Sequence, residues 1–327
     1  MRAALCKQFG GPDVITVETI EDPKPGPGEA VVSVSAVALN FLDTLMIRGK
    51  YQYKVEPPFS PGVEVAGTIA ELGPDVTGFQ VGDRVLAFVR MNGCREMVLV
   101  KASELIALPD SVDDKVASCF TVTYGTAIHA FNDRAKLQEG ETVAVLGASG
   151  GAGLAAVEVA KMMGAHVIAA ASSAEKLEVC KAHGADQLLN YKDQDLKEQL
   201  KALTGGKGAD VIYDCVGGPY SEPALRATAW EGRFLVIGFA AGEIPKIPLN
   251  LLLLKGCSMV GVFWGEFAAR DPEGHRRNIE QVIEWCASGR LDPRIDATYT
   301  LDQTREALEA IDQRRATGKV IVLPQAG

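Results

Sequence analysis

The pattern of apolar and polar positions changes near residue 142, and the two textures predict two kinds of domain. Before that point, valine-rich stretches at 30–37, 63–72 and 83–89 lie between turns rich in glycine and proline. Such short, turn-punctuated stretches are typical of strands in a β-rich unit. Apolar residues at helical spacing over 40–48, followed by Gly49, predict one short helix within this unit.

From residue 142 the chain repeats a strand, a turn and a helix. Apolar strands are expected at 142–146, 166–171, 187–190, 210–214 and 233–237, with a sixth candidate at 258–262. Strands that alternate with helices predict parallel βαβ units with right-handed crossovers. We therefore expect an α/β fold whose doubly wound parallel sheet occupies residues 122–260.

The remaining segment is too short to form a domain of its own. It holds an amphipathic helix at about 272–287, a helix at 302–315 with an acidic start, and a last strand at 319–323. We expect residues 261–327 to return to the β-rich unit of residues 1–121, so that the α/β domain is inserted between its two parts.

Length and charge limit the classes of function. The 327 residues suffice for about two domains. The 42 acidic side chains exceed the 33 basic ones, giving a net charge of −9, so the chain has no general cationic field for nucleic acid. No apolar run approaches the ~20 residues of a membrane span, and the first residues lack the apolar core of a signal peptide. We expect a cytoplasmic protein without nucleic-acid or membrane partners.

The seven cysteines are scattered, and none lies within four residues of another. The chain therefore has no Cys-x-x-Cys pair, which argues against a structural zinc site and against a disulfide framework. Thiols of this kind are expected to stay reduced.

The strongest local motif is Gly147-x-x-Gly150-x-x-Gly153, between an expected strand and an expected helix. Glycines in this place allow a sharp turn and a close approach of backbone N–H groups to a pyrophosphate. Alone, the triplet is compatible with a mere tight turn. Four further strands follow it, and this context favours a dinucleotide site, with Ser149, Gly151 and Ala152 in the same loop.

The second strand ends in Ser172-Ser173, with Lys176 one helical turn later. An NAD site commonly carries a carboxylate here for the ribose 2′-hydroxyl, whereas hydroxyls and an ammonium suit a 2′-phosphate. This end, with Tyr191 after the third strand, favours NADP(H). The alternative is that one serine caps the next helix and that Lys176 is solvated.

Several motifs together resemble the medium-chain dehydrogenase/reductase superfamily, in its zinc-free NADPH:quinone oxidoreductase branch. They are Asn40-Phe-Leu-Asp43, Gly49-Lys-Tyr51, the segments 61–67 and 81–85, Tyr124-Gly-Thr-Ala127 and the ending 317–324. The resemblance covers nearly the whole chain and implies a Rossmann domain inserted in a GroES-like catalytic domain. It also implies a homodimer formed through the edge of the Rossmann sheet, for which 249–262 is a candidate.

The resemblance further implies the residues of the site. Asn40 and Tyr51 would border the nicotinamide pocket as catalytic residues, and Asp43 is interpreted as a structural acceptor. Asn40 stands where zinc-dependent relatives have a cysteine, and Val63 stands where they have a histidine, so no metal is expected. The implied cofactor contacts beyond the glycine loop and the second and third strand ends are Asn40, Thr126, Val216, Gly217, Gly238, Phe239 and Phe263.

Three functions remain open from the sequence. The first is an NADPH-dependent quinone reductase that transfers a hydride directly, since a quinone is electrophilic without help from a metal. The second is a reductase of conjugated carbonyls such as enones, enals or acrylates. The third, of a different class, is an NADPH-binding protein with little turnover, as in crystallin relatives.

Overall fold

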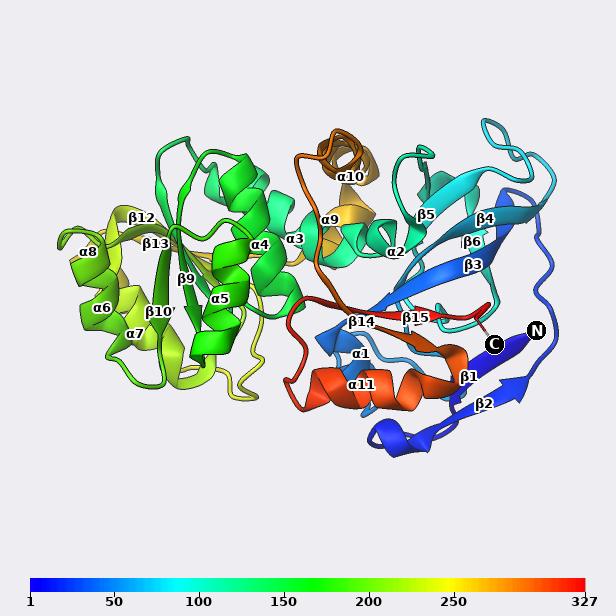
Figure 1. Ribbon diagram of the computed structural model, residues 1–327, viewed down its shortest axis with the longest axis horizontal. Coiled ribbons are helices and arrows are strands. Elements are labelled where there is room, and N and C mark those ends of the chain that lie inside the picture. Colours follow the sequence, from blue (N-terminus) through cyan, green and yellow to red (C-terminus); the bar gives the residue numbers. More distant parts are fainter. Residues whose placement is uncertain (327) are drawn as a thin grey trace. The chain divides into compact units, whose positions relative to one another are not determined.

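The computed structural model describes residues 1–326, and the chain divides into two compact units. Unit 1 comprises Met1–Val122 and the residues from Ile279 onward, and unit 2 is Thr123–Asn278. The α/β fold class expected from the sequence is confirmed, with the parallel sheet in unit 2 and a largely antiparallel sheet in unit 1 (Figure 1).

Unit 2 is built on a six-stranded parallel sheet in the order β10-β9-β8-β11-β12-β13. Counted from its first strand, this is the 3-2-1-4-5-6 order of dinucleotide-binding folds. Its inner strands are nearly continuous apolar runs because helices cover both faces of such a sheet. The strands are β8 (Thr142–Leu146), β9 (His166–Ala171), β10 (Gln187–Asn190), β11 (Ala209–Asp214), β12 (Thr228–Val236) and β13 (Ser258–Gly261).

The helices of unit 2 follow from local sequence signals. In α6, for example, Asp195 accepts a hydrogen bond from the backbone N–H of Glu198 at 2.9 Å, and Leu196 and Leu200 are buried one turn apart. The helices are α3 (Gly125–Ile128), α4 (Gly151–Met162), α5 (Ala174–Ala182), α6 (Leu196–Leu203), α7 (Ser221–Arg226), α8 (Asn250–Lys255) and α9 (Trp264–Arg270); α10 (Pro272–Ala287) begins here and continues into unit 1. Short π-helical and 3-10 segments of unit 2 are η4 (His129–Ala135) and η5 (Gly218–Tyr220), and the π-helical segment η3 (Phe120–Tyr124) crosses from unit 1 into unit 2.

Unit 1 contains a seven-stranded sheet in which β3 pairs with β15, β4 and β6. Valines of β3 and its neighbours form the core, for instance Val37 opposite Val65 and Val322. The strands of this sheet are β3 (Glu29–Leu39), β4 (Glu64–Leu72), β5 (Arg84–Phe88), β6 (Met97–Lys101), β7 (Leu105–Ala107), β14 (Ile295–Thr300) and β15 (Lys319–Leu323). A separate two-stranded sheet pairs β1 (Arg2–Cys6) with β2 (Ile15–Thr19). The helices are α1 (Phe41–Met46), α2 (Asp114–Ala117) and α11 (Thr304–Asp312), with short 3-10 turns η1 (Pro12–Val14), η2 (Ala102–Glu104) and η6 (Leu301–Gln303).

Two helices begin at other residues than the sequence predicts, because capping residues set where each helix starts. The short helix expected over 40–48 is α1, which begins at Phe41 with Asn40 as its N-cap. The helix expected from 302 begins at Thr304, because a 3-10 turn with a capping box between Thr300 and Gln303 precedes it. The pattern of charged residues alone does not show which residue is the N-cap of a helix.

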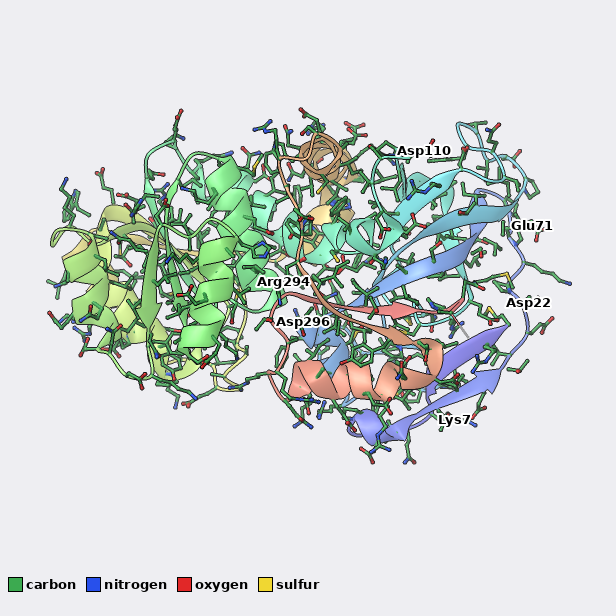
Figure 2. The ribbon with its side chains drawn as sticks, viewed as in Figure 1. Lys7, Asp22, Glu71, Asp110, Arg294 and Asp296 are labelled. Atoms are coloured by element: carbon green, nitrogen blue, oxygen red, sulfur yellow. The ribbon has the colours of Figure 1, made fainter. Side chains whose placement is uncertain are left out.

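Charged side chains lie mainly at the surface. Lys7, Asp22, Glu71 and Asp110 of unit 1 are exposed, and Figure 2 shows their side chains projecting from the ribbon. Over residues 1–326, no helix combines the length and the apolar character needed to cross a membrane.

Candidate functional site

The turn between β8 and α4 is shaped by close backbone approaches. Gly147 has a φ of +71°, and a Cβ there would lie 2.9 Å from Cγ2 of Val216. A Cβ at Gly153 would lie 2.2 Å from the carbonyl oxygen of Gly147. These two positions therefore exclude a side chain for reasons internal to the protein.

The N-terminus of α4 is left open by this turn. Its N-cap is Gly150, which has no side chain, so no side-chain cap accepts a hydrogen bond from the backbone N–H groups of the first turn. A Cβ at Gly150 would meet only the oxygen of Gly147, at 3.6 Å, so packing does not require glycine here. The first backbone N–H groups, including those of Gly151 and Ala152, and the helix dipole suit the pyrophosphate of a dinucleotide. The predicted glycine loop thus fits that cofactor.

The end of β9 combines one cap with one cation. Oγ of Ser173 accepts from the backbone N–H of Lys176 at 3.4 Å, so this hydroxyl caps α5, as the alternative interpretation held. A hydrogen bond from Ser173 lowers the pKa of Glu175, which is exposed. Ser172 is half-buried beside the cap. The positions directly after β9 carry no carboxylate before Glu175.

Tyr191 is brought to this same strand end. Its backbone N–H donates to the carbonyl of Ala171, the last residue of β9, at 3.2 Å, and Ser172 follows directly after Ala171. Its ring packs against that of Tyr220, with centroids 4.6 Å apart. Sequence reasoning missed Tyr220, because nothing in the segment 217–220 indicates that its ring meets that of Tyr191, which lies far earlier in the chain.

Asp214 organises the loop after β11. Its buried carboxylate accepts from the backbone N–H groups of Val216 and Gly217 at 2.8 and 2.9 Å, and from Oγ of Ser221 at 2.6 Å. These bonds satisfy the charge and hold the loop in one conformation. Neither Asp214 nor Ser221 was among the predicted residues, although an acid at a strand end before two glycines was an available signal.

The predicted loop residues of three strands meet. Gly147 lies against Val216, and a Cβ at Gly217 would lie 2.8 Å from the ring of Phe239. The backbone N–H of Gly238 donates to the carbonyl of Asp214 at 3.2 Å. The structure therefore gathers these residues at the carboxyl ends of β8, β11 and β12, where ligands of open α/β sheets bind.

Two predicted contacts lie apart from these loops in the chain. Thr126 is half-buried in α3, and Phe263 follows β13 with its side chain 44% exposed. Their role as cofactor contacts stays a prediction.

Asn40 lies in unit 1 with its amide fully engaged. Nδ2 donates to Oε1 of Glu64 at 2.9 Å and to the carbonyl of Ala38 at 3.3 Å. Oδ1 accepts from Nζ of Lys319 at 2.6 Å. Asp43 accepts from the backbone N–H groups of Asn40 and Gly62 at 2.7 and 2.8 Å, which matches its interpretation as a structural acceptor.

Burial raises the pKa values of two groups of unit 1, Asp43 and Tyr51. It raises the pKa of Asp43 to about 7, although the two backbone N–H groups oppose the shift. Burial also raises the pKa of Tyr51 to about 12, with smaller contributions from Tyr53 and Asp43. The Tyr51 phenol is therefore protonated at neutral pH and can act as a hydrogen-bond donor.

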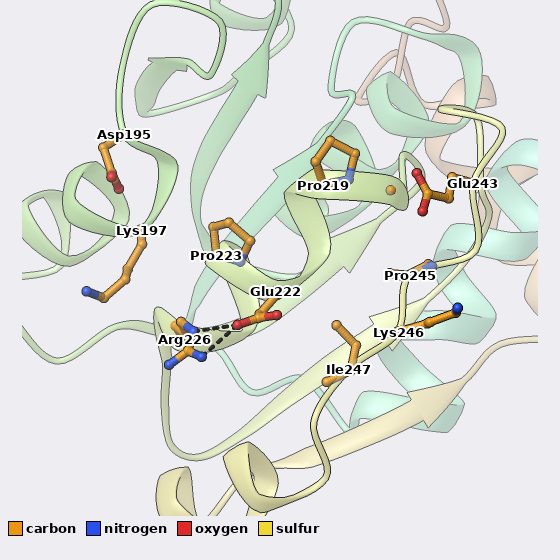
Figure 3. A pocket seen from close by; sticks show the side chains of 11 residues that line it. Asp195, Lys197, Pro219, Glu222, Pro223, Arg226, Glu243, Pro245, Lys246 and Ile247 are labelled. Carbon is orange, nitrogen blue, oxygen red and sulfur yellow. Dashed lines mark hydrogen bonds and ion pairs between the residues drawn. The ribbon is translucent and has the colours of Figure 1, made fainter.

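A separate cavity of about 590 Å³ opens beside η5 and α7 (Figure 3). It shares no residue with the predicted cofactor contacts. Its lining includes three acids and three bases, and Arg226 is paired with Glu222 at 2.6 Å. Balanced charges of this kind do not favour an anion over a cation.

The histidines and acids do not form a metal centre. Among residues 1–326, no three side chains of His, Cys, Asp or Glu come together in a way that could hold a metal ion. His129 and His183 each pair with a carboxylate, at 2.8 and 2.6 Å. Burial lowers the pKa of His275 to about 4. The hydrogen bonds of His129 and His183 give these two side chains structural roles.

Comparison with known proteins agrees with this architecture. Residues 26–110 match the family of alcohol dehydrogenase GroES-like domains, and residues 151–288 match the family described as zinc-binding dehydrogenase. The chain is 39% identical over 324 residues to quinone oxidoreductase-like protein 2 homolog of Nematostella vectensis, covering 98% of this chain and 88% of that protein. It is 30% identical to quinone oxidoreductase of Pseudomonas aeruginosa, with 97% of each chain covered.

A solved structure shows the same fold over the full length. Escherichia coli quinone oxidoreductase complexed with NADPH has a TM-score of 0.91 at 25% identity, covering 99% of this chain and 100% of that one. Together these findings define an oxidoreductase with a GroES-like and a nicotinamide-dinucleotide-binding domain. The chain belongs to the medium-chain dehydrogenase/reductase superfamily, in its quinone oxidoreductase branch.

Substitutions at Gly153 and Gly150 should affect the stability of the fold and the binding of NADPH separately. Gly153→Ala should destabilise the fold by about 1–3 kcal/mol, because its Cβ meets backbone. Gly150→Ala should cost about 1 kcal/mol or less as a changed N-cap, yet weaken NADPH about tenfold or more by occupying the space of the pyrophosphate. Urea unfolding and fluorescence titration with NADPH measure the two effects. Wild-type affinity in Gly150→Ala would contradict the assignment.

Proposed function

We propose that this protein is an NADPH-dependent quinone reductase that works without zinc by direct hydride transfer. The observation that carries the proposal is the uncapped N-terminus of α4, which follows a glycine turn at the carboxyl edge of the sheet. The names of the relatives supply the class of acceptor. Conjugated carbonyls are the alternative acceptors, since the same hydride step reduces them.

The preference for NADPH rests on the end of β9. Ser172 and Lys176 stand where an NAD site carries a carboxylate, and a hydroxyl with an ammonium complements a 2′-phosphate. Ser173 acts as the cap of α5, so we assign the phosphate to Ser172, Lys176 and the phenol of Tyr191. The relative solved with NADPH supports this choice.

The chemistry asks little of the protein beyond binding and hydrogen bonding. NADPH, when bound, would supply a hydride, and a quinone that takes up this hydride and one proton becomes a hydroquinone. Tyr51 would donate a hydrogen bond to the carbonyl oxygen on which negative charge develops. The N–H groups of Asn40 are already used by Glu64 and Ala38, so Asn40 contributes as a positioned neighbour of the cofactor.

Zinc independence follows from the donor set. The position of Asn40 offers an amide whose atoms are engaged, and Val63 has no ligand atom. Zinc needs three or four N, S or O ligands from the protein. The seven cysteines are free thiols, four of them buried, which suits a reducing compartment such as the cytoplasm.

We also propose that two copies associate through the edge of the parallel sheet. β13 is the last strand of that sheet, and Met259 on it is partly exposed. Four large apolar side chains from β12 and from the segment with α8 are 70–80% exposed: Trp230, Leu249, Leu253 and Leu254. An edge strand next to such a patch is a natural surface for pairing with a second copy.

Cofactor choice can be tested on one helix. Lys176→Ala removes a charge-assisted hydrogen bond worth about 1.5–3 kcal/mol, so NADPH should bind about 10- to 150-fold more weakly while NADH is nearly unchanged. Lys181→Ala, an exposed lysine near the other end of α5, is the matched control. Titration of both cofactors decides the matter, and equal losses for NADPH and NADH would remove the phosphate role.

The role of Tyr51 can be tested with two acceptors. Tyr51→Phe removes one hydroxyl and should lower the single-turnover rate of NADPH oxidation by several-fold to about 100-fold. The loss should be larger with an enone than with a quinone, because the enone carbonyl needs more polarisation. Tyr53→Phe, on the neighbouring ring, is the control. Unchanged rates with both acceptors would leave Tyr51 as a packing residue, and binding without any turnover would favour the NADPH-binding protein.

Association can be tested by charging the patch. Leu253→Glu with Leu254→Glu should convert a dimer into a monomer, because two carboxylates would have to be buried at the contact. Val81→Glu adds a charge at an exposed apolar position of unit 1 and should leave the mass unchanged. Sedimentation of the three proteins measures this. A wild-type monomer, or a dimer that survives both charges, would refute the proposed contact.

A further inference from the structure

A buried carboxylate joins four segments of unit 1. Glu64, at the start of β4, has no exposed surface, and its two oxygens accept four hydrogen bonds. Oε2 accepts from Oγ1 of Thr121 and from the backbone N–H of Val122, both at 2.8 Å. Oε1 accepts from Nδ2 of Asn40 and from Nζ of Lys319, both at 2.9 Å. All of its acceptor capacity is therefore used.

Lys319 is the only cation paired with this carboxylate among the described residues. Its side chain is 3% exposed and comes from the first residue of β15. Its ammonium lies 2.9 Å from Oε1 of Glu64 and 2.6 Å from Oδ1 of Asn40. The three side chains thus close a ring of hydrogen bonds in which each member contacts the other two.

This ring fixes the orientation of the Asn40 amide. A rotation of the amide by half a turn would place Oδ1 against the carboxylate of Glu64 and Nδ2 against the ammonium of Lys319. Both contacts would be repulsive in a buried place, where electrostatic interactions are strong. Both N–H groups are used, by Glu64 and by the carbonyl of Ala38. Oδ1 accepts from Lys319 and also faces the backbone N–H of Asp43 in the capping box of α1, so the amide is held at both ends.

We infer that Lys319, acting with Glu64, is a positioning residue that holds the Asn40 amide, and with it the first turn of α1, in one orientation beside the bound molecule. This inference rests on the proposed function in one respect, that Asn40 borders the bound cofactor. It gives Asn40 a fixed place at the edge of the bound cofactor and leaves the stabilisation of a developing oxyanion to other groups.

Stability alone does not account for a buried ion pair here. Replacing such a pair by neutral groups of similar volume is often neutral or stabilising, whereas removing one partner is strongly destabilising because a charge is left buried alone. The two effects can be separated with three variants. They are Lys319→Met, the double variant Glu64→Gln with Lys319→Met, and the control Arg84→Met, which breaks the ion pair of Arg84 with Asp114 elsewhere in unit 1.

The first measurement is the single-turnover rate of quinone reduction at saturating NADPH, at a temperature where circular dichroism shows every variant folded. Lys319→Met should lower the melting temperature and slow the reaction about tenfold or more. The double variant should regain most of the melting temperature but keep the slow rate, because the amide is still not held. Arg84→Met should lose stability and keep the wild-type rate. Should Lys319→Met fail to fold, the double variant carries the test.

The second measurement does not depend on activity. In protein labelled with ¹⁵N on asparagine side chains, the Asn40 amide protons, identified by their absence in Asn40→Ser, should exchange slowly with solvent. They should exchange much faster in the double variant. A rate that recovers with stability, or protection that survives loss of Lys319, would overturn the inference. A wild type that reduces neither quinone nor enone would refute the proposed function, while the exchange data would still decide whether Lys319 holds the amide.

Discussion

The candidate cofactor site depends on one constraint, the close approach of backbone segments at the turn between β8 and α4. The carbonyl of Gly147 lies where a side chain of residue 153 would be, and Val216 lies where one of residue 147 would be. This close packing brings the start of α4 to the sheet edge with its first N–H groups uncapped. The strand order then places the loops of β8, β11 and β12 together. A ligand with a pyrophosphate fits the result because the helix terminus supplies donors and a positive field.

Buried carboxylates hold the functional segments of both units. Asp214 fixes the loop after β11, Asp43 joins α1 to Gly62, and Glu64 joins β4 to β15 and to Asn40. A buried charge is costly unless nearly all of its acceptor capacity is used. A carboxylate whose oxygens all accept hydrogen bonds would lose some of these bonds if the surrounding loops moved. The loops around it therefore keep one conformation although they have no regular secondary structure.

The two units supply different chemistry. Unit 2 offers backbone donors and a cationic strand end, which suit phosphates, whereas unit 1 offers an oriented amide and a protonated phenol. Neither unit shows a group arranged as a metal ligand set within residues 1–326. A reductase whose acceptor is already electrophilic needs no more than this, since hydrogen bonding and orientation are then the main contributions of the protein.

The sequence by itself determined the features that local physics specifies. Glycine spacing, apolar strands and helix periodicity predicted the glycine turn, the parallel strands and the helix after Asn40, because each depends on neighbours within a few residues. Residues such as Ser173 could be assigned two roles, and only the structure showed that its hydroxyl caps α5. The contact of Tyr191 with Tyr220, and the ring formed by Asn40, Glu64 and Lys319, were decided by tertiary structure alone. Lys319 lies 255 residues from Glu64 and 279 from Asn40 along the chain. The pattern of apolar and polar residues does not indicate which distant strand will contact a buried charge.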